Sequence, residues 1–528
     1  MAAKRYKCPK CRERFMAKNG KTPGGQQRWL CGSRVDGKFI VCYSTTDPTK
    51  PYRDQAMNAR KADERPRFKR ALGGMKRFVI TWAQNATPVH QGFFAALKNY
   101  CKRNDAELIV IPGRYKNPTS QWTEAQQNAE VWAAELTPYL YNGRKKLNDN
   151  ITLLADIKTQ PTAVSPLTGF EGLTHAESAI LGHPRLQLVT IATPQSRMPK
   201  IMTTTGAITV PNYTDTRAGK RGAFDHVLGA ALVEIESSKI FHLRQLNARR
   251  DGAFIDLDTA YYPDGTAEPC GPYLGLVLGD MHVRFRDPVV ERATFGPGGL
   301  VDLLNPQTLV FHDLLDAYAV NPHHVGDPFV AVAKQAAGFH DIRREVMEAI
   351  DWLAAVSKGR QAVIVPSNHD DMLKRWLVRE DWRRDPRNAE FYLETALHLV
   401  RSTVMTERGA QTVDPFGYWV ERMAPKNVRA LRRGESFTIA GIECNLHGDA
   451  GPNGARGTVK NLSKIGVKVI SGHGHSPAIE GGHYRVGTST PLSLEYTGPV
   501  GSWLNTHCSI DPFGKRHLHN IIDGSFRA

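Results

Sequence analysis

Five short apolar segments of the chain each stop at side chains that can bind a metal ion. Residues 274–279 are followed by Asp280 and His282, two positions that lie on the same face of an extended strand. The other segments, 308–311, 362–366, 437–446 and 466–470, are followed in turn by Asp313, by Asn368, by His447, and by His473 with His475. Carboxylate, amide and imidazole ligands suit borderline divalent cations. The pattern predicts a metal site where these segments end.

The order of these motifs resembles that of the calcineurin-like metallophosphoesterases. That family carries Asp-x-His, Gly-Asp-x-x-Asp, Gly-Asn-His-Asp/Glu, a lone His and Gly-His-x-His, and residues 272 to about 510 hold counterparts of all five motifs. His312 and Ser367 stand where the family usually has glycine. The resemblance implies two metals, with Asp313 bridging them, one bound by Asp280, His282 and His475 and the other by Asn368, His447 and His473.

The resemblance also implies a reaction. Two ions roughly 3.5–4 Å apart can hold a hydroxide, lower its pKa and clamp a phosphate during in-line displacement. We expect His369 to protonate or polarise the leaving oxygen, with Asp316 or Asp370 orienting its ring. The expected enzyme is a phosphoesterase with two divalent metals, manganese first and iron or zinc as alternatives.

Four of the eight cysteines fall within the first 42 residues: Cys8, Cys11, Cys31 and Cys42. A Cys-x2-Cys turn lets two thiolates share a tetrahedral zinc, which a second pair must complete. The pattern resembles the zinc ribbons of some transposases and phage proteins, although Arg34 stands where their last cysteine would be. We expect residues 1–44 to form a zinc-ribbon-like module with one structural zinc.

Positive charge is concentrated at the start of the chain. Residues 1–75 hold 19 Lys or Arg and 6 Asp or Glu, whereas the rest of the chain holds 50 and 46. This asymmetry favours a nucleic-acid partner, with a merely solubilising segment as the alternative, and residues 45–75 are expected to be a basic linker. A second basic segment contains Arg217, Lys220 and Arg221, and its role as a phosphate contact or a solvated loop stays open.

The remaining elements predict an α/β chain of several domains. Strands over 77–82 and 107–112 around a helix over 90–103 indicate a βαβ unit, so we expect an N-terminal α/β domain over 76–265. A helix is expected from about 329 to 356. From the resemblance, residues 266–528 should form the catalytic domain, a β-sandwich flanked by helices.

The excess of positive charge in residues 1–75 and the predicted zinc module in residues 1–44 favour DNA as the substrate. The domain order also resembles that of pre-early phage proteins that take part in DNA transfer and host-DNA degradation, whose phosphoesterase domain is like that of SbcD-type nucleases. We expect a manganese-dependent DNase with little sequence selectivity. The alternatives are a phosphomonoesterase or nucleotidase, and a DNA-binding or transfer protein with secondary phosphoesterase activity.

No apolar run of membrane-spanning or signal-peptide type occurs in the sequence. We therefore expect no membrane partner and a cytoplasmic location, which is the host cytoplasm if a phage encodes the protein. A homo-oligomer stays open.

Overall fold

The computed structural model describes residues 5–8, 11–22, 25–35, 38–47, 76–115, 131–407, 409–495 and 497–528. The chain divides into two compact units, residues 1–68 and 69–528. Residues 48–75, most of the predicted basic linker 45–75, lie outside the described part. Among the described residues, no helix has the length and apolar character needed to cross a bilayer.

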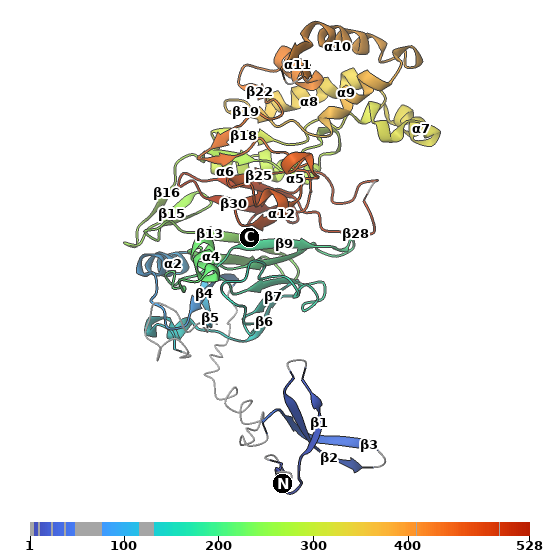
Figure 1. Ribbon diagram of the computed structural model, residues 1–528. Helices are drawn as coiled ribbons and strands as arrows, with labels where there is room; N and C mark the ends of the chain where they lie inside the picture. Colours follow the sequence, from blue (N-terminus) through green and yellow to red (C-terminus); the bar gives the residue numbers. More distant parts are fainter. Residues whose placement is uncertain are drawn as a thin grey trace. The chain divides into compact units, whose positions relative to one another are not determined.

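The first unit is a three-stranded antiparallel sheet (Figure 1). Its strands are β1 (Ala17–Lys21), β2 (Gln27–Val35) and β3 (Lys38–Thr45). Cys8, Met16 and Cys31 are its buried apolar residues, packed by Cys11, Trp29 and Cys42. So small a core supplies little stability of its own, and a metal held by the cysteines would supply more.

A six-stranded sheet lies at the centre of the second unit. Its order is β22 (Val428–Ala430), β19 (Gln361–Ile364), β18 (Thr308–Phe311), β17 (Gly275–Val277), β29 (Thr506–Ile510) and β30 (Arg516–Asn520). The first four strands are parallel to one another, β29 is antiparallel to β17, and β30 is antiparallel to β29. Leu276 and Leu278 point to one face and Val277 to the other, so both faces are buried.

Helices cover the face of this sheet that carries Leu276 (Figure 1). They are α5 (Pro288–Phe295), α6 (Leu300–Leu304), α8 (Ile342–Val356), α9 (Asp370–Arg379), α10 (Ala389–Ser402) and α11 (Pro415–Met423). The single helix predicted from 329 to 356 is wrong. Gly338 ends α7 (Pro328–Ala337) in the left-handed conformation, and Asp341 caps the start of α8.

A ten-stranded sheet packs on the other face of the six-stranded sheet, through Ile442, Ile470 and Tyr484. Its order is β23 (Thr438–Ile439), β24 (Ile442–Glu443), β25 (Lys468–Ser471), β27 (His483–Arg485), β26 (Ala478–Glu480), β9 (Gln187–Ile191), β11 (Lys200–Thr204), β8 (Ser178–Leu181), β7 (Ile151–Leu154) and β6 (Arg144–Asn148). Because β9 pairs with β26, the sheet joins residues on both sides of the boundary predicted between 265 and 266.

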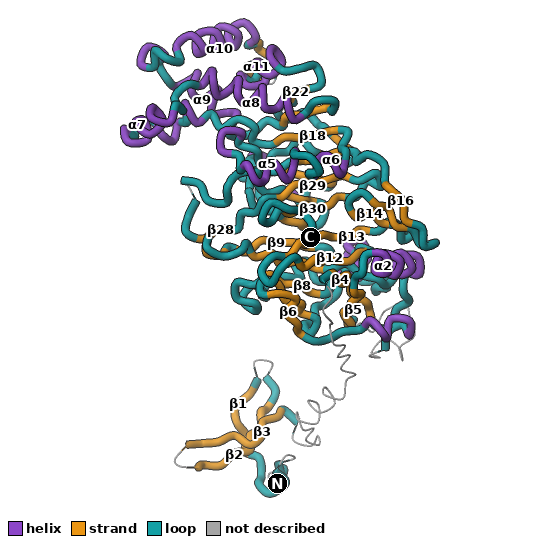
Figure 2. The backbone as a smooth tube through the Cα atoms, turned by 180° about the vertical axis from the view of Figure 1, so that it is seen from behind, coloured by secondary structure: helices purple, strands orange, loops and turns teal. Residues whose placement is uncertain are grey.

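The smaller sheets complete the second unit (Figure 2). The predicted βαβ unit is present as β4 (Arg77–Gln84), α2 (Gln91–Arg103) and β5 (Glu107–Gly113), with β4 and β5 parallel. The remaining elements are β12 (Gly229–Ile235) and β13 (Phe241–Asn247) beside β4, β14 (Phe254–Asp256) with β15 (Thr259–Tyr261) and β16 (Ala267–Pro269), β10 (Thr193–Pro194) with β28 (Val500–Gly501), β20 (Val404–Thr406) with β21 (Gly409–Gln411), α4 (Arg217–Asp225) and α12 (Val459–Leu462). The second unit is thus a mixed α/β structure of stacked sheets with helices on the outer face.

Candidate metal centre

The seven predicted metal ligands are delivered by the ends of five strands. β17, β18 and β19 are parallel neighbours, so their carboxyl ends meet at one edge of the six-stranded sheet. The loop after β24 meets the loop after β25, where Gly472 N–H donates to the His447 carbonyl at 2.8 Å. Likewise His282 N–H donates to the Asp313 carbonyl at 2.7 Å, which holds the first two loops together.

The first group of ligands consists of Asp280, His282, Asp313 and His475, all buried. The Nε2 atoms of His282 and His475 lie 3.1 Å apart, and His475 Nε2 lies 3.1 Å from Asp280 Oδ2. Metal bonds of about 2.1 Å at right angles would place neighbouring ligand atoms about 3 Å apart. The spacing of these side chains therefore fits one divalent cation.

The second group consists of Asn368, His447 and His473. Asn368 Oδ1 lies 3.1 Å from His447 Nε2 and 3.0 Å from His473 Nδ1. Asp313 Oδ2 connects the two groups, because it lies 3.2 Å from His447 Nε2 and 3.7 Å from His282 Nε2. Asp313 thus occupies the position that the resemblance assigns to a bridging ligand.

Among the described residues, three buried carboxylate oxygens of this cluster lack a hydrogen bond of good geometry. They are Oδ1 of Asp313 and both oxygens of Asp280, although His475 Nε2 lies 3.1 Å from Asp280 Oδ2. Buried carboxylates without donors are costly, and a cation is the group that offsets this cost. No thiolate is present in the cluster, which favours manganese, iron or a catalytic zinc over a structural zinc. The donor set therefore fits two divalent metals.

Four of these ligands have left-handed backbone conformations. The φ angles of His282, Asp313, His473 and His475 are 42°, 43°, 69° and 51°. Non-glycine residues rarely adopt this region, and strained positions of this kind cluster at functional sites. Gly472 is required for a different reason, because a Cβ there would lie 2.1 Å from Asp280 Oδ1.

His369 lies at the edge of the cluster, with its Nδ1 3.5 Å from Asp316 Oδ1. The same carboxylate oxygen lies 2.9 Å from His282 Nδ1. Burial alone would lower the pKa of His369, but the carboxylates of Asp313 and Asp316 outweigh burial and raise the pKa to about 10. The imidazole is thus held in its protonated form.

Of the two acids predicted to orient His369, Asp316 is the one that contacts it. Asp370 instead pairs with Ser367, whose N–H donates to Asp370 Oδ2 at 3.2 Å and whose Oγ accepts from Asp370 N–H at 3.1 Å. This pair closes the turn that leads into α9. The Ser367 side chain thus has a structural use at a position where the family usually has glycine.

His312 was given no role by its sequence, yet it lies behind a metal ligand. Its Nδ1 is 3.4 Å from Nδ1 of His447, whose Nε2 faces Asp313 and Asn368. Burial lowers the pKa of His312 to about 4, so the ring is neutral. A residue that fills this position can fix the orientation of His447. The only feature of the sequence that could have pointed to His312 is its position between the apolar segment 308–311 and the ligand Asp313.

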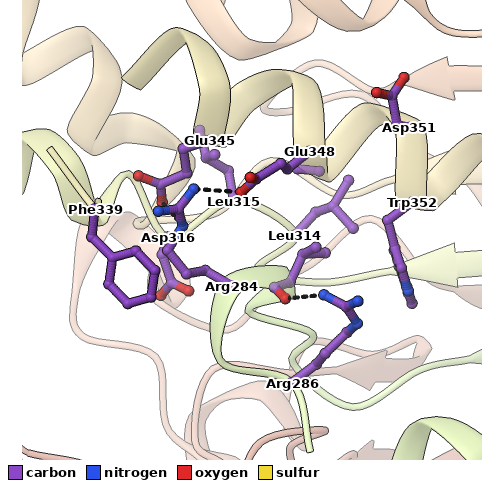
Figure 3. Close-up of a pocket in the computed structure, with 12 residues that line it drawn as sticks. Arg284, Arg286, Leu314, Leu315, Asp316, Phe339, Glu345, Glu348, Asp351 and Trp352 are labelled. Atoms are coloured by element: carbon purple, nitrogen blue, oxygen red, sulfur yellow. Dashed lines mark hydrogen bonds and ion pairs between the residues drawn. The ribbon is translucent and has the colours of Figure 1, made fainter. Parts of the chain in front are cut away.

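A cavity of about 420 Å³ adjoins the cluster through Asp316 (Figure 3). Arg284 and Arg286 point into it, as do Glu345 and Glu348, and Trp352 forms one wall. Burial raises the pKa of Glu345 to about 7, although Arg284 and the backbone N–H groups of residues 318 and 319 oppose the shift. None of the seven predicted metal ligands lines this cavity.

The predicted zinc ligands Cys8, Cys11, Cys31 and Cys42 come together in the first unit. Cys11 Sγ and Cys31 Sγ are 3.8 Å apart, and all four thiols are free of disulfides. Zinc–sulfur bonds of about 2.3 Å in a tetrahedron place sulfurs about 3.8 Å apart. Hydrogen bonds from the backbone of Arg14 and Glu13 lower the pKa of Cys11 to about 6, whereas burial raises the pKa values of Cys31 and Cys42.

The basic segment with Arg217, Lys220 and Arg221 is a helix and not a loop. Thr216 caps α4, and the three cationic side chains are exposed. Lys220 Nζ lies 2.5 Å from Asp215. Phe224 follows on the same face with 89% of its surface exposed. Among the described residues, no hydrogen bond or ion pair joins Arg217, Lys220 or Arg221 to a predicted metal ligand.

Comparison with known proteins finds a similarity over most of the chain. No family model matches the chain, and no solved structure matches it. Protein A1 of Escherichia phage T5 is 33% identical over 507 residues, which cover 91% of this chain and 90% of protein A1. The similarity supports a phage origin for this chain. The chain belongs to the family of phage T5 protein A1.

Proposed function

We propose that this protein is a metal-dependent phosphodiesterase with a calcineurin-like fold. The observation that carries the proposal is the position of Asp313, whose Oδ2 lies within 3.7 Å of His282 and 3.2 Å of His447, the nearest histidines of the two ligand groups. Stacked sheets with helices on the outer face support the fold assignment. Asp280, His282, Asp313 and His475 would hold one cation, and Asp313, Asn368, His447 and His473 the other.

Two bound divalent cations would supply Lewis acidity and a water of lowered pKa for attack on a phosphodiester. His369 would donate its proton to the leaving oxygen, and the Asp316 carboxylate beside it would favour the protonated ring. Asp316 would hold both His369 and His282 in place through a single oxygen. After transfer, a water molecule from solvent would reprotonate His369, whose side chain is 20% exposed.

We propose DNA as the substrate, cut with little sequence selectivity in the cytoplasm of the bacterial host. Three features support a polyanionic substrate: the excess of Lys and Arg in residues 1–75, the four-cysteine cluster, and the exposed basic face of α4. Phosphate contacts of this kind give affinity that is independent of sequence. The similarity to a phage protein is consistent with a role in host-DNA degradation or DNA transfer.

The test is incubation of the full-length chain with plasmid, linear and single-stranded DNA and with p-nitrophenyl phosphate, in Mn²⁺ or in EDTA. We expect loss of plasmid in Mn²⁺ only, and its abolition by Asp313→Ala and by His369→Ala. Asp264→Ala, a change of an exposed carboxylate in the turn between β15 and β16, is the matched control and should leave cleavage intact.

Other outcomes would contradict the proposal. Rapid turnover of the monoester with intact plasmid would identify a phosphomonoesterase. Retarded but uncut DNA would identify a DNA-binding protein. Cleavage that persists in Asp313→Ala would show that the activity does not arise at this site.

A further inference from the structure

Exposed apolar side chains are concentrated in one part of the second unit. Among the described residues, twenty large hydrophobic side chains are exposed, and ten of them fall between residues 325 and 405. The helical layer that contains this segment otherwise packs tightly on the six-stranded sheet. Exposed apolar side chains that gather in one region mark an interaction surface more often than scattered ones do.

Helix α10 carries the most regular part of this surface. Leu393, Leu397 and Val400 are 46%, 50% and 74% exposed, and Val404 and Met405 continue the apolar surface just beyond the helix. The spacing of four and then three residues places the first three on one stripe. The opposite face is buried through Phe391 and Thr395. In Figures 1 and 2, α10 lies at the outer edge of the helical layer, away from β18.

The charges beside the stripe differ between the two ends of α10. Glu390 and Glu394 lie in its first half, and Arg401 lies in its last turn. Arg343 pairs with Glu394 at 3.0 Å, but the Glu394 side chain stays 34% exposed. The Glu394 carboxylate can therefore accept a hydrogen bond from a second donor. Arg401 forms no ion pair with any other described residue. In an antiparallel pair of α10 helices, Glu394 of each copy would face Arg401 of the other.

We propose that α10 is a self-association surface, on which a second copy of this chain packs antiparallel about a two-fold axis near Leu397. Two such stripes can cover each other's exposed apolar side chains, and the flanking charges are complementary only when the helices run in opposite directions. A two-fold interface repeats every contact, so Leu393, Leu397 and Val400 would be covered in both copies and two Glu394–Arg401 pairs would form. Stable interfaces bury about 800 Å² per partner, so Val404 and Met405 would be covered as well.

Sedimentation velocity on the full-length chain over a range of concentrations tests the proposal. We expect a mass of at least twice the 58.7 kDa of one chain. Leu397→Glu should halve that mass, because a buried pair of carboxylates would face each other at the axis. Val467→Glu changes a residue that is 55% exposed outside this surface and should leave the mass unchanged. Circular dichroism of each variant shows whether it is folded.

A charge exchange gives a second test, in which recovery of association is measured as well as its loss. Arg401→Glu should weaken association, and adding Glu394→Arg should restore it, because the two symmetric ion pairs are re-formed with their signs reversed. A wild-type mass of 58.7 kDa at every concentration would overturn the proposal. So would an association that Leu397→Glu leaves intact, or a double variant that dissociates as fully as Arg401→Glu.

Discussion

Asp316 lies at the edge of the metal cluster and contacts both a predicted ligand, His282, and the predicted proton donor, His369. One of its oxygens, Oδ1, reaches both His282 Nδ1 and His369 Nδ1, and the other oxygen has no hydrogen-bond donor among the described residues. A carboxylate behind a ligand histidine fixes the tautomer and raises the basicity of the ring. Asp316 therefore links metal binding to proton donation.

Asp316→Asn should weaken manganese binding on the order of 10- to 100-fold and lower DNA cleavage further, since the ring of His369 loses its neighbouring charge. Equilibrium dialysis against Mn²⁺ measures the affinity. Asp351→Asn is the matched control, because Asp351 lines the cavity beside Asp316 but is exposed. An unchanged affinity in Asp316→Asn would contradict this role.

Glu345 makes a separate prediction about stability. Because its pKa in the folded chain is raised to about 7, ionisation disfavours the fold: the stability is fully present below the ordinary pKa of 4.5 and is lost as pH rises through 7. Between pH 5.5 and pH 8 the loss amounts to about 2 kcal/mol. Glu345→Gln should remove that slope in urea unfolding, and Glu348→Gln, at a half-exposed neighbour, should keep it. Equal slopes in both variants would be inconsistent with a buried, neutral Glu345.

At the scale of elements, the site depends on how closely the strand ends approach one another. Gly472 follows β25 and lies so near Asp280 that a side chain has no room. The left-handed conformations of His473 and His475 then turn both imidazoles back toward the cluster. The sequence Gly-His-Gly-His is thus explained by space as well as by ligand chemistry.

Gly472→Ala should lower DNA cleavage on the order of 100-fold, because displacement of Asp280 by about 1 Å disturbs the first ligand group. Gly482→Ala is the control, since a Cβ there would meet its nearest atom at 3.5 Å. Cleavage assays with matched thermal unfolding separate lost geometry from lost stability. Full activity in Gly472→Ala would mean that Asp280 does not need its present position.

Local patterns predicted the strand ends well and the helix boundaries less well. An apolar run followed within a few residues by Asp, Asn or His identifies β17, β18, β19 and β25, because burial and strand alternation are both visible over a few residues. The run over 437–446 is instead a hairpin of two short strands, since Ala440 and Gly441 both take positive φ. Apolar periodicity continues across such turns and hides them.

At the scale of the whole molecule, pairing between distant strands was beyond reach of the sequence. The contact between β9 and β26 joins residues nearly three hundred positions apart, and it merges two predicted domains into one sheet. The contact of His312 with His447 is hidden for the same reason, because it depends on how two loops meet. The seven ligands could be predicted only from the resemblance to the calcineurin-like metallophosphoesterases, because in that family residues of the five motifs lie together in the fold.

The division of labour between the two units is testable by deletion. Removing residues 1–75 takes away 19 Lys or Arg and the cysteine cluster but leaves the larger compact unit nearly whole. DNA binding should weaken and its salt dependence should flatten, because fewer counterions are released. Turnover of p-nitrophenyl phosphate should stay constant. Equal loss of both activities would contradict the division.

We propose that seven side chains hold two divalent cations, with Asp313 shared between them. Elemental analysis after equilibrium dialysis of the full-length chain against Mn²⁺ tests it most directly, since thiolates of the cysteine cluster select zinc over manganese. We predict two manganese ions per wild-type chain and no more than one in Asp313→Asn. A wild-type chain that retains no more manganese than Asp313→Asn would contradict a shared Asp313.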